Sequence, residues 1–351
     1  MSEEFIFKAK TREAFVLKIL GELVNFVLTF ASFRINEKGI FLLQPCDFNH
    51  QMIEIALYKE YFPYYKCDVP ISFEVNCSHL HKMLKAIKKK DSITLFINND
   101  NEDELKLGIC VEQSDENNKV LTYIPINKTR VEDIKVPTEY DNPIIMTSKE
   151  FQKLKNLHII SDDLTVTSKP EFIKFFCDGG SIYSREIVIG NENDEDNKHI
   201  NITYKQTFNT PYITRLTKCA GQSGTVQIFV HENNGMKIKM KAGGLGDVIV
   251  YIKSKEIIED ENLDENLVVI GKESNSVKED LSEYIQRDDD DEKVPTLSER
   301  SSSEQSSGFP LGGKMATGGN QKNKILIEDD NYSDSEDNST SKKSSTKIKR
   351  K

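Results

Sequence analysis

The sequence lacks the patterns that mark most secreted, zinc-binding and membrane-spanning proteins. Its six cysteines are scattered without any C-x-x-C pair, so neither a disulfide framework nor a zinc site is predicted. No apolar run reaches the roughly 18 residues of a transmembrane helix. The first residues, Met-Ser-Glu-Glu, are acidic and have no signal-peptide layout. These absences favour an intracellular protein in a reducing compartment.

Groups that carry enzyme chemistry are also missing. The six histidines show no metal-ligand spacing, and His79 and His81 are two residues apart, which places them on different faces of a helix. Neither of the glycine-rich segments 221–224 and 242–246 combines the two features of a phosphate loop, which follows a strand and opens a helix with a lysine. We therefore expect no catalytic residue, no metal and no cofactor.

Negative charge is concentrated at one end of the chain. The formal net charge of the 351 residues is -10. Residues 1–255 hold 33 Lys and Arg against 34 Asp and Glu, whereas residues 256–351 hold 14 against 23. The body is therefore nearly neutral, and it can be basic on one surface and acidic on another.

Four amphipathic segments resemble one another and predict helices at repeated intervals. The segments are Thr11–Asn25, Cys77–Lys90, Thr147–Ile160 and Asn209–Gly221. The first pair and the second pair have similar internal spacing, so the pattern predicts two similar domains with two helices each.

Short β-branched or alternating runs separated by Asn, Asp, Gly or Pro predict strands between the helices. In the first half they are Phe30–Ile35, Gly39–Leu43, Met52–Tyr58, Ile71–Val75, Ser92–Ile97, Leu105–Val111 and Val120–Pro125. In the second half they are Leu164–Ser168, Phe172–Asp178, Ser181–Ile189, His199–Tyr204, Thr225–Phe229, Met236–Lys241 and Val248–Ile252. The predicted class is α+β, with two β-rich halves.

Two segments lack the predicted pattern of helices and strands, and they set the predicted domain boundaries. Residues 127–143 carry two prolines and many charges, which predicts a surface connector between the halves. Residues 260–351 are polar, low in complexity and poor in aromatics, so we expect a disordered acidic tail. The halves are then residues 1–126 and 144–259.

The repeated helices carry an excess of basic residues on their polar faces. These are Lys18, Lys82, Lys85, Lys88, Lys89, Lys90, Lys149, Lys153, Lys155, Arg215 and Lys218. For a single helix, the simpler explanation is that lysines keep the outer face solvated. Because the pattern recurs in four equivalent places, we favour presentation of positive charge to a polyanion.

Several segments resemble the DNA sliding clamps of the proliferating cell nuclear antigen family. The resemblance rests on "GIFLLQPCDFNH" (39–50), "YYKCDVPISFEVNCSHLHKMLKAIKKKDSITL" (64–95), "SKEFQKL" (148–154) and "LGDVIVYIKSKEIIEDE" (245–261). It covers about residues 5–260 and points to a large-DNA-virus or divergent eukaryotic member. The motif usually written Ala-Pro-Lys is here Lys253-Ser254-Lys255, and the long tail is a further departure.

The resemblance implies a DNA-clamp fold whose helices line the hole of a ring. Their basic residues would then contact duplex DNA through its phosphates, without reading sequence. The residues implied for DNA binding are Lys18, Lys82, Lys85, Lys88, Lys149, Lys153, Lys155, Arg215 and Lys218.

It also implies that copies of the chain join through edge strands, here Lys119–Ile126 and Ser181–Ile189. The implied interface residues are Tyr123, Ile124, Ile187 and Val188. The alternative is that both strands are ordinary sheet edges with no partner.

Family clamps bind short partner peptides, which carry a glutamine and apolar anchors, in a pocket beneath the connector. The pocket residues that the resemblance implies are Pro45, Phe48, His50, Val131, Ile134, Val136, Pro137, Tyr251, Ile252 and Lys253. The substitutions at Lys253 and Ser254 leave the peptide preference open.

The function predicted is a non-enzymatic clamp and processivity factor for DNA replication and repair, most simply a homotrimer. Its expected partners are duplex DNA, DNA polymerase, clamp-binding peptides and an ATP-driven loader, with no membrane. The expected location is the nucleus, or a viral replication factory. A subunit of a heterotrimeric checkpoint-type clamp, an acidic histone-chaperone-like protein and an enzyme with a cryptic site remain as alternatives.

Overall fold

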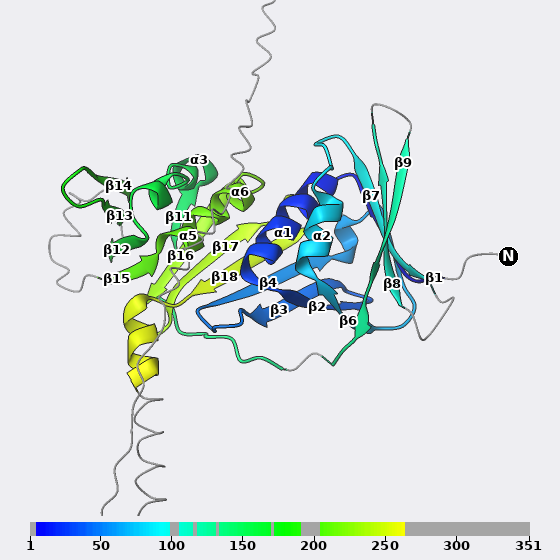
Figure 1. Cartoon of the computed structure of the whole chain (residues 1–351), viewed down its shortest axis with the longest axis horizontal. Helices are drawn as coiled ribbons and strands as arrows, with labels where there is room; N and C mark the ends of the chain where they lie inside the picture. Colours follow the sequence, from blue (N-terminus) through cyan, green and yellow to red (C-terminus); the bar gives the residue numbers. More distant parts are fainter. Residues whose placement is uncertain are drawn as a thin grey trace, which may run out of the picture. The chain divides into compact units, whose positions relative to one another are not determined.

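The computed structural model describes residues 5–98, 105–114, 118–130, 133–169, 172–190 and 204–263 (Figure 1). All of them belong to a single structural unit. Strands outnumber helices throughout this part of the chain, which confirms the predicted α+β class.

The first half runs through two helices and nine strands. Its elements are β1 (Phe5–Thr11), α1 (Ala14–Val27), β2 (Phe30–Asn36), β3 (Gly39–Pro45), β4 (Gln51–Tyr58), the 3-10 turn η1 (Lys59–Tyr61), β5 (Tyr64–Cys67), β6 (Ile71–Asn76), α2 (Cys77–Leu84), β7 (Ser92–Asn98), β8 (Lys106–Glu112) and β9 (Lys119–Pro125). The helix α2 begins where the Asn76 side chain accepts the backbone N–H of His79 at 3.0 Å.

The second half repeats this order with shorter helices. After β10 (Asn127–Lys128), its elements are β11 (Ile144–Thr147), α3 (Ser148–Gln152), the 3-10 turn η2 (Leu157–Ile159), β12 (Asp163–Lys169), β13 (Phe172–Asp178), β14 (Ser184–Gly190), β15 (Tyr204–Asn209), α5 (Thr210–Thr214), α6 (Leu216–Ala220), β16 (Thr225–His231), β17 (Gly235–Lys241) and β18 (Gly246–Ile252). Thr147 and Glu150 form a reciprocal capping box that starts α3, and Pro211 lies in the first turn of α5. Residues 255–263 form a further helical segment.

The strands form three antiparallel sheets that show the duplication directly. The orders are β5-β1-β7-β8-β9, then β10-β6-β2-β3-β4-β18-β17-β16-β11, then β14-β13-β12-β15. The two halves meet where β4 pairs with β18, in a register that runs from Gly246 opposite Leu57 to Ile252 opposite Gln51. One continuous sheet therefore spans both halves.

The helices form one layer over this sheet, and Figure 1 shows α1 and α2 side by side there. Within the layer α1 packs against α2 and α6, and α6 packs against α3. Buried apolar side chains of α1, such as Val16, Leu20 and Val24, pack into the core below. The exposed positions of the layer include many lysines.

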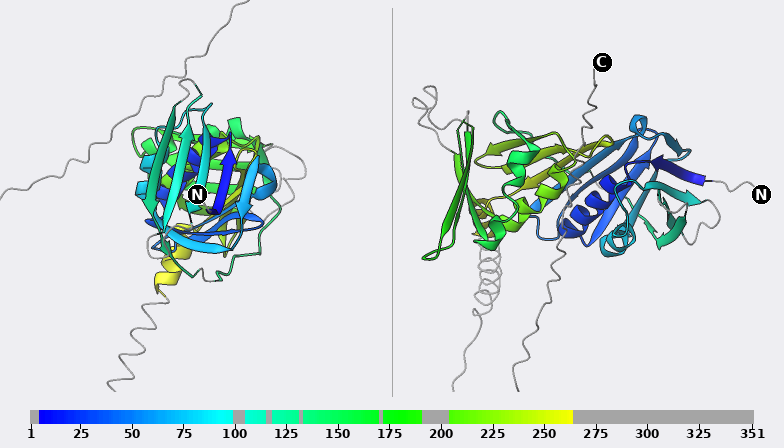
Figure 2. Two further views of the ribbon diagram at one scale, coloured as in Figure 1. Left: turned by 90° about the vertical axis from the view of Figure 1, so that its right-hand side faces the viewer. Right: turned by 90° about the horizontal axis from the view of Figure 1, so that it is seen from above.

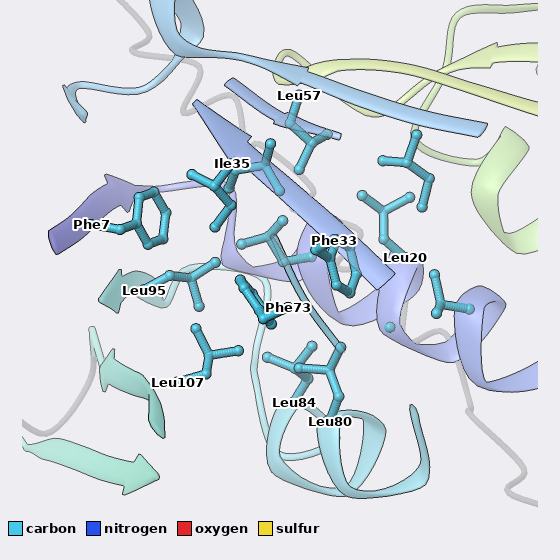
Figure 3. A pocket seen from close by; sticks show the side chains of 15 residues that line it. Phe7, Leu20, Phe33, Ile35, Leu57, Phe73, Leu80, Leu84, Leu95 and Leu107 are labelled. Carbon is cyan, nitrogen blue, oxygen red and sulfur yellow. The ribbon is translucent and has the colours of Figure 1, made fainter. Parts of the chain in front are cut away.

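A small apolar cavity lies inside the first half (Figure 3). Its volume is about 80 Å³, and it is bounded by α1, α2 and both sheets of that half. Figure 3 shows Leu20 from α1, Leu80 and Leu84 from α2, and Phe33 and Phe73 from the sheet converging on it. Packing in this half is therefore incomplete beside Gly21, which also lines the cavity.

Several predicted boundaries are wrong, for identifiable reasons. Thr11 does not begin the first helix, because it ends β1, and the helix starts at Ala14. The segment Asn209–Gly221 is two short helices, α5 and α6, which meet at Arg215. The third predicted helix shortens to α3 and η2.

Some strands were also misplaced or overlooked. The strand predicted at His199–Tyr204 overlaps β15 (Tyr204–Asn209) only at Tyr204. Residues 199–203 lie outside the described residues. The strands β1, β5, β10 and β11 were not predicted. Except for β1 they span four residues or fewer, too few to display an alternating pattern.

Candidate functional site

The exposed face of the helix layer carries most of the basic residues predicted for DNA binding. The exposed ones are Lys82, Lys85, Lys88, Lys149, Lys153, Lys155, Arg215 and Lys218. They come from α2 and its following turn, from α3 and its following turns, and from the α5–α6 junction and α6. Three of the four segments that sequence analysis singled out therefore place exposed basic side chains on one layer.

Lys18 is the exception among these residues, because it is half-buried. Its Nζ donates a hydrogen bond to the backbone oxygen of Ile87 at 3.1 Å, and it also lies 5.6 Å from the centre of the Phe15 ring. The ammonium thus binds the turn after α2 and ties α1 to it.

The centre of the layer is a polar pocket between α1, α2 and α6. Glu22 of α1 forms an ion pair with Lys218 of α6, and the Arg215 guanidinium lies 5.2 Å from the centre of the Phe26 ring. His81 of α2 completes the lining. Two cations at the centre are therefore already engaged by groups of the protein itself.

The two predicted interface strands are both sheet edges. β9 ends the five-stranded sheet and β14 ends the four-stranded sheet. Tyr123 and Val188 expose 49% and 37% of their surface, whereas Ile124 and Ile187 are buried in the core of the same chain. An interface here would use the outward side chains of Tyr123 and Val188 and only the backbone of the two isoleucines.

The other edge of the four-stranded sheet is protected. The Glu256 carboxylate accepts the backbone N–H of Thr207 in β15, with its oxygens 2.9 Å and 3.0 Å away. Lys255 forms an ion pair with Asp163 of β12, which fixes the helical segment 255–263 beside this edge. An occupied edge cannot template another strand, so β14 is the open edge of that sheet within the part of the chain that the structure describes.

The predicted partner pocket is distributed over a loop, the connector and β18. In the loop, Phe48 exposes 80% of its surface, and its ring lies 6.1 Å from that of His50. The oxygen of His50 accepts the backbone N–H of Lys253 at 3.0 Å, which brings the loop to the end of β18. Pro45 is half-buried at the start of the loop.

The connector residues Ile134, Val136 and Pro137 are half-buried, and Val131 lies outside the described residues. Figure 1 shows the connector on the side of the nine-stranded sheet away from α1 and α2. Tyr251 and Ile252 of β18 are buried, so they contribute little surface themselves.

Sequence reasoning missed Tyr140, which anchors the end of the connector. Its ring lies 6.4 Å from the rings of Phe229 and Tyr251, and its hydroxyl donates to the oxygen of Asn234 at 3.3 Å. Burial raises the pKa of Tyr140 to about 12. The Lys237 Nζ lies 5.3 Å from the centre of the same ring. An aromatic residue in an otherwise charged connector was the available signal.

No group of three or more His, Cys, Asp or Glu side chains is placed to hold a metal within the described residues. In the same part of the chain, no helix has both the length and the apolar character needed to cross a membrane.

Comparison with known proteins identifies the family. Residues 6–129 match the model of the proliferating cell nuclear antigen N-terminal domain, and residues 135–255 match that of the C-terminal domain. A proliferating cell nuclear antigen of Chaetomium thermophilum is 27% identical over 257 residues, which cover 71% of this chain and 97% of the relative. A probable DNA polymerase sliding clamp of Autographa californica nuclear polyhedrosis virus is 25% identical and is covered completely, with 74% of this chain aligned.

A probable DNA polymerase sliding clamp of Paramecium bursaria Chlorella virus 1 is 23% identical over 256 residues, which span 70% of this chain and 95% of the relative. These alignments take in nearly the whole of each relative and leave about a quarter of this chain unmatched. The two family models together cover more than half of the sequence. The chain belongs to the proliferating cell nuclear antigen family.

Proposed function

We propose that this chain is a DNA polymerase sliding clamp whose copies close head to tail into a ring around duplex DNA. Membership of the family supports the general function, a non-enzymatic processivity factor. The observation that carries the proposal is the continuous helix layer, which presents exposed lysines and arginines on one face. Such side chains bind phosphates without reading bases, as a protein that slides requires.

The duplication supplies a template for ring closure. The second half repeats the strand order of the first. The order β6-β2-β3-β4 corresponds to β15-β12-β13-β14, and β1-β7-β8-β9 corresponds to β11-β16-β17-β18, so β4 matches β14 and β9 matches β18. Inside the chain, β4 pairs with β18. Among the described residues, their counterparts β14 and β9 each lie unpaired at the edge of a sheet, and each has seven residues. Pairing β14 of one copy with β9 of the next would repeat the internal junction between molecules, which is head-to-tail association.

The template also predicts a contact. Within the chain, the Tyr251 hydroxyl of β18 donates to Glu54 of β4 at 2.9 Å across the junction. Tyr123 holds the position of Tyr251, because Tyr123 is the cross-strand partner of Gly108 in β8 and Tyr251 is the partner of Lys237 in the corresponding strand β17. Glu186 in the sequence "REIVI" matches Glu54 in "IEIAL". We therefore expect Tyr123 to donate a hydrogen bond to Glu186 of the neighbouring subunit.

Exposed apolar side chains favour the same two edges. Val120, Leu121 and Tyr123 of β9 each expose about half of their surface. Next to β14, Ile182 and Tyr183 expose 82% and 50%. A cluster of this kind on an uncovered strand is an aggregation hazard for a monomer and a usual feature of an interface.

The face away from the helices is the proposed partner-docking side. Ile134 and Val136 would receive the apolar anchors of a clamp-binding peptide beside the loop that carries Phe48 and His50. This surface lies on the other side of the nine-stranded sheet from the basic layer, so a bound polymerase and encircled DNA would not compete for it.

The remaining parts of the proposal follow from the family resemblance. Three copies would form the ring, an ATP-driven loader would open it, and the site of action would be the nucleus or a viral replication factory. The domain limits 1–126, 127–143, 144–259 and 260–351 also stay predictions.

The test is whether the protein is a ring that links to DNA. Light scattering should give a mass of about three times the 40.1 kDa chain. After incubation with a family clamp loader and ATP, the protein should stay on circular plasmid through a salt wash and dissociate when the plasmid is cut. A single-chain mass at micromolar concentration contradicts ring closure by one kind of subunit. Equal retention on circular and cut DNA contradicts encirclement.

A further inference from the structure

One row of cross-strand partners on the outer face of the second half is an aromatic cluster. Phe229, Lys237 and Tyr251 are successive partners across β16, β17 and β18. Tyr140 of the connector lies over them, and the Lys237 Nζ is 4.8 Å from the centre of the Phe229 ring and 5.8 Å from that of Tyr251. The chain itself thus fills this position, with a connector tyrosine and a central lysine.

The first half has the same row on the outer face of its five-stranded sheet. Phe96, Gly108 and Tyr123 are successive partners across β7, β8 and β9. The Phe96 ring meets the Tyr123 ring edge-on at 5.9 Å and the Phe5 ring at 5.5 Å. Phe5 therefore takes the place that Tyr140 has in the other half. Gly108 stands where the other half has Lys237, and the Phe96 ring lies over it.

The outer face of this sheet has a groove beside these rings. Its volume is about 570 Å³, and Leu121, Tyr64 and Cys110 line it together with the three rings. A Cβ added at Gly108 would lie 2.3 Å from the Phe96 ring, so the glycine allows that ring to lie against the strand. Figure 2, left, shows this sheet facing the viewer with no described helix or connector across it. Tyr123 and Leu121 expose 49% and 52% of their surface there.

The groove is also positively charged. The Lys8 Nζ lies 4.0 Å from the centre of the Phe5 ring, and Lys10 and Lys119 bind Glu112 at 2.7 Å and 3.0 Å. Hydrogen bonds from Lys10 and Lys119 lower the pKa of Glu112 to about 2, so this carboxylate stays ionised and occupied at neutral pH. Three ammonium groups face one carboxylate in the lining, which leaves an excess of positive charge.

We propose that this groove is a second docking surface, which takes an extended acidic peptide of a partner protein with an aromatic or apolar anchor. The anchor would occupy the space above Cys110, which Tyr64, Leu121 and Tyr123 border. The acidic side chains would pair with Lys8 and Lys10. Charge complementarity selects an acidic partner over a basic one. The surface is separate from the connector, and it borders the proposed subunit junction, which also uses Tyr123.

Peptide titration tests the groove. The probes are a fluorescein-labelled peptide in which Asp and Glu alternate with Phe and Leu, and a matched peptide with Lys in place of every acid. The acidic probe should bind the full chain and the basic probe should not. Lys8→Glu with Lys10→Glu should weaken binding by at least about tenfold, since both charges change sign. Lys8→Ala, which keeps the Lys10–Glu112 pair, should weaken binding less while circular dichroism stays unchanged.

Matched variants separate this surface from others. Lys205→Glu, an exposed position on β15, and Ile134→Ala with Val136→Ala in the connector should leave the affinity for the acidic probe unchanged. Loss of binding in the connector variant, or wild-type affinity in the Lys8→Glu, Lys10→Glu variant, overturns the proposal. So does loss of the ring mass in the Lys8→Glu, Lys10→Glu variant, because a second copy of the chain would then be the occupant. Plasmid retention by the wild-type protein tests clamp function separately, because it does not depend on whether the acidic probe binds.

Alkylation of a cysteine tests, independently of affinity, whether the peptide binds in the groove. Cys110 lines the groove, whereas Cys46 lies beside the Phe48 loop. A bromoacetyl group on the acidic peptide should alkylate the Cys110 sulfur, with loss of bromide, and mass spectrometry should find the adduct there. Cys110→Ser should remove that adduct. Equal labelling of Cys46 and Cys110 would show that the peptide is not held in the groove and would overturn the assignment.

Discussion

The ammonium of Lys218 on α6 forms an ion pair with the carboxylate of Glu22 on α1, at the centre of the basic helix layer. Both side chains are partly exposed, so the pair contributes little to stability. Its consequence is electrostatic, because a phosphate that approaches Lys218 must compete with a carboxylate already in place. The layer therefore has lysines on its outer helices, α2 and α3, and a partly neutralised centre.

Replacing Glu22 with Gln should strengthen DNA binding, because Lys218 becomes available to a phosphate. The salt dependence of binding should steepen by up to about one unit, the slope of one added phosphate contact. Fluorescence anisotropy across a series of salt concentrations measures both quantities. Lys218→Met in the same background should cancel the gain. A gain that persists in the double variant would mean that Glu22 acts through net charge alone.

Reversing the charge of Lys82, Lys85 and Lys153 to Glu should weaken DNA binding and flatten its salt dependence, by roughly one unit for each lysine that no longer binds a phosphate. These residues lie on the two outer parts of the layer. The matched control is Lys38→Glu, Lys59→Glu and Lys205→Glu, which changes the net charge equally at exposed positions off the helices. Equal weakening in the two triple variants would show that the helix layer is not the DNA-binding surface.

The subunit junction should contain a hydrogen bond between Tyr123 and Glu186 of the next copy. Tyr123→Phe and Glu186→Gln should each weaken association, and a double-mutant cycle should give a coupling of about 0.5–1.5 kcal/mol. Dilution series followed by light scattering provide the association constants. Tyr61→Phe, at an exposed tyrosine away from both edges, is the control. Additive effects in the cycle would mean that these two side chains do not meet.

The connector variant Ile134→Ala with Val136→Ala should weaken a clamp-binding peptide by about 1–3 kcal/mol, as expected when side chains that a bound peptide would bury are truncated at a small interface. Titration calorimetry measures this change. Plasmid retention should be unaltered, because the helix layer lies on the opposite face. Wild-type peptide affinity in this variant would place the pocket elsewhere.

Much of the fold could be predicted because the long elements carry strong patterns. The stripe of α1 and the alternation of β4 are set by burial on one side, and burial leaves a periodic trace in the sequence. The family and its general function were predicted correctly from distributed similarity. Short pairings such as β5 and β11 depend on partners far along the chain, so four residues alone could not reveal them.

The details of the sites were less predictable, for a related reason. Lys18 and Lys218 resemble the other lysines in sequence, and only their neighbours Ile87 and Glu22 distinguish them. Ile124 alternates with Tyr123 on an edge strand, and packing decides which side chain points inward. The paired rows of Phe96 and Phe229 could have been found by aligning "SITLFIN" with "TVQIFVH", since the duplication was already recognised.

The apolar cavity in the first half makes Gly21→Ala a stabilising change. A glycine inside a helix costs about 1 kcal/mol relative to alanine. A Cβ at this position would lie 2.8 Å from Cδ1 of Leu84, which is the flexible end of a side chain that borders the cavity with Gly21. Leu84 can turn into the space of about 80 Å³, so the close approach is relieved while the cavity shrinks. The free energy of unfolding in urea should rise by about 0.5–1 kcal/mol. Gly21→Val, which adds branched bulk in a helix, should not stabilise the protein, and a loss of stability in Gly21→Ala would show that Leu84 cannot move.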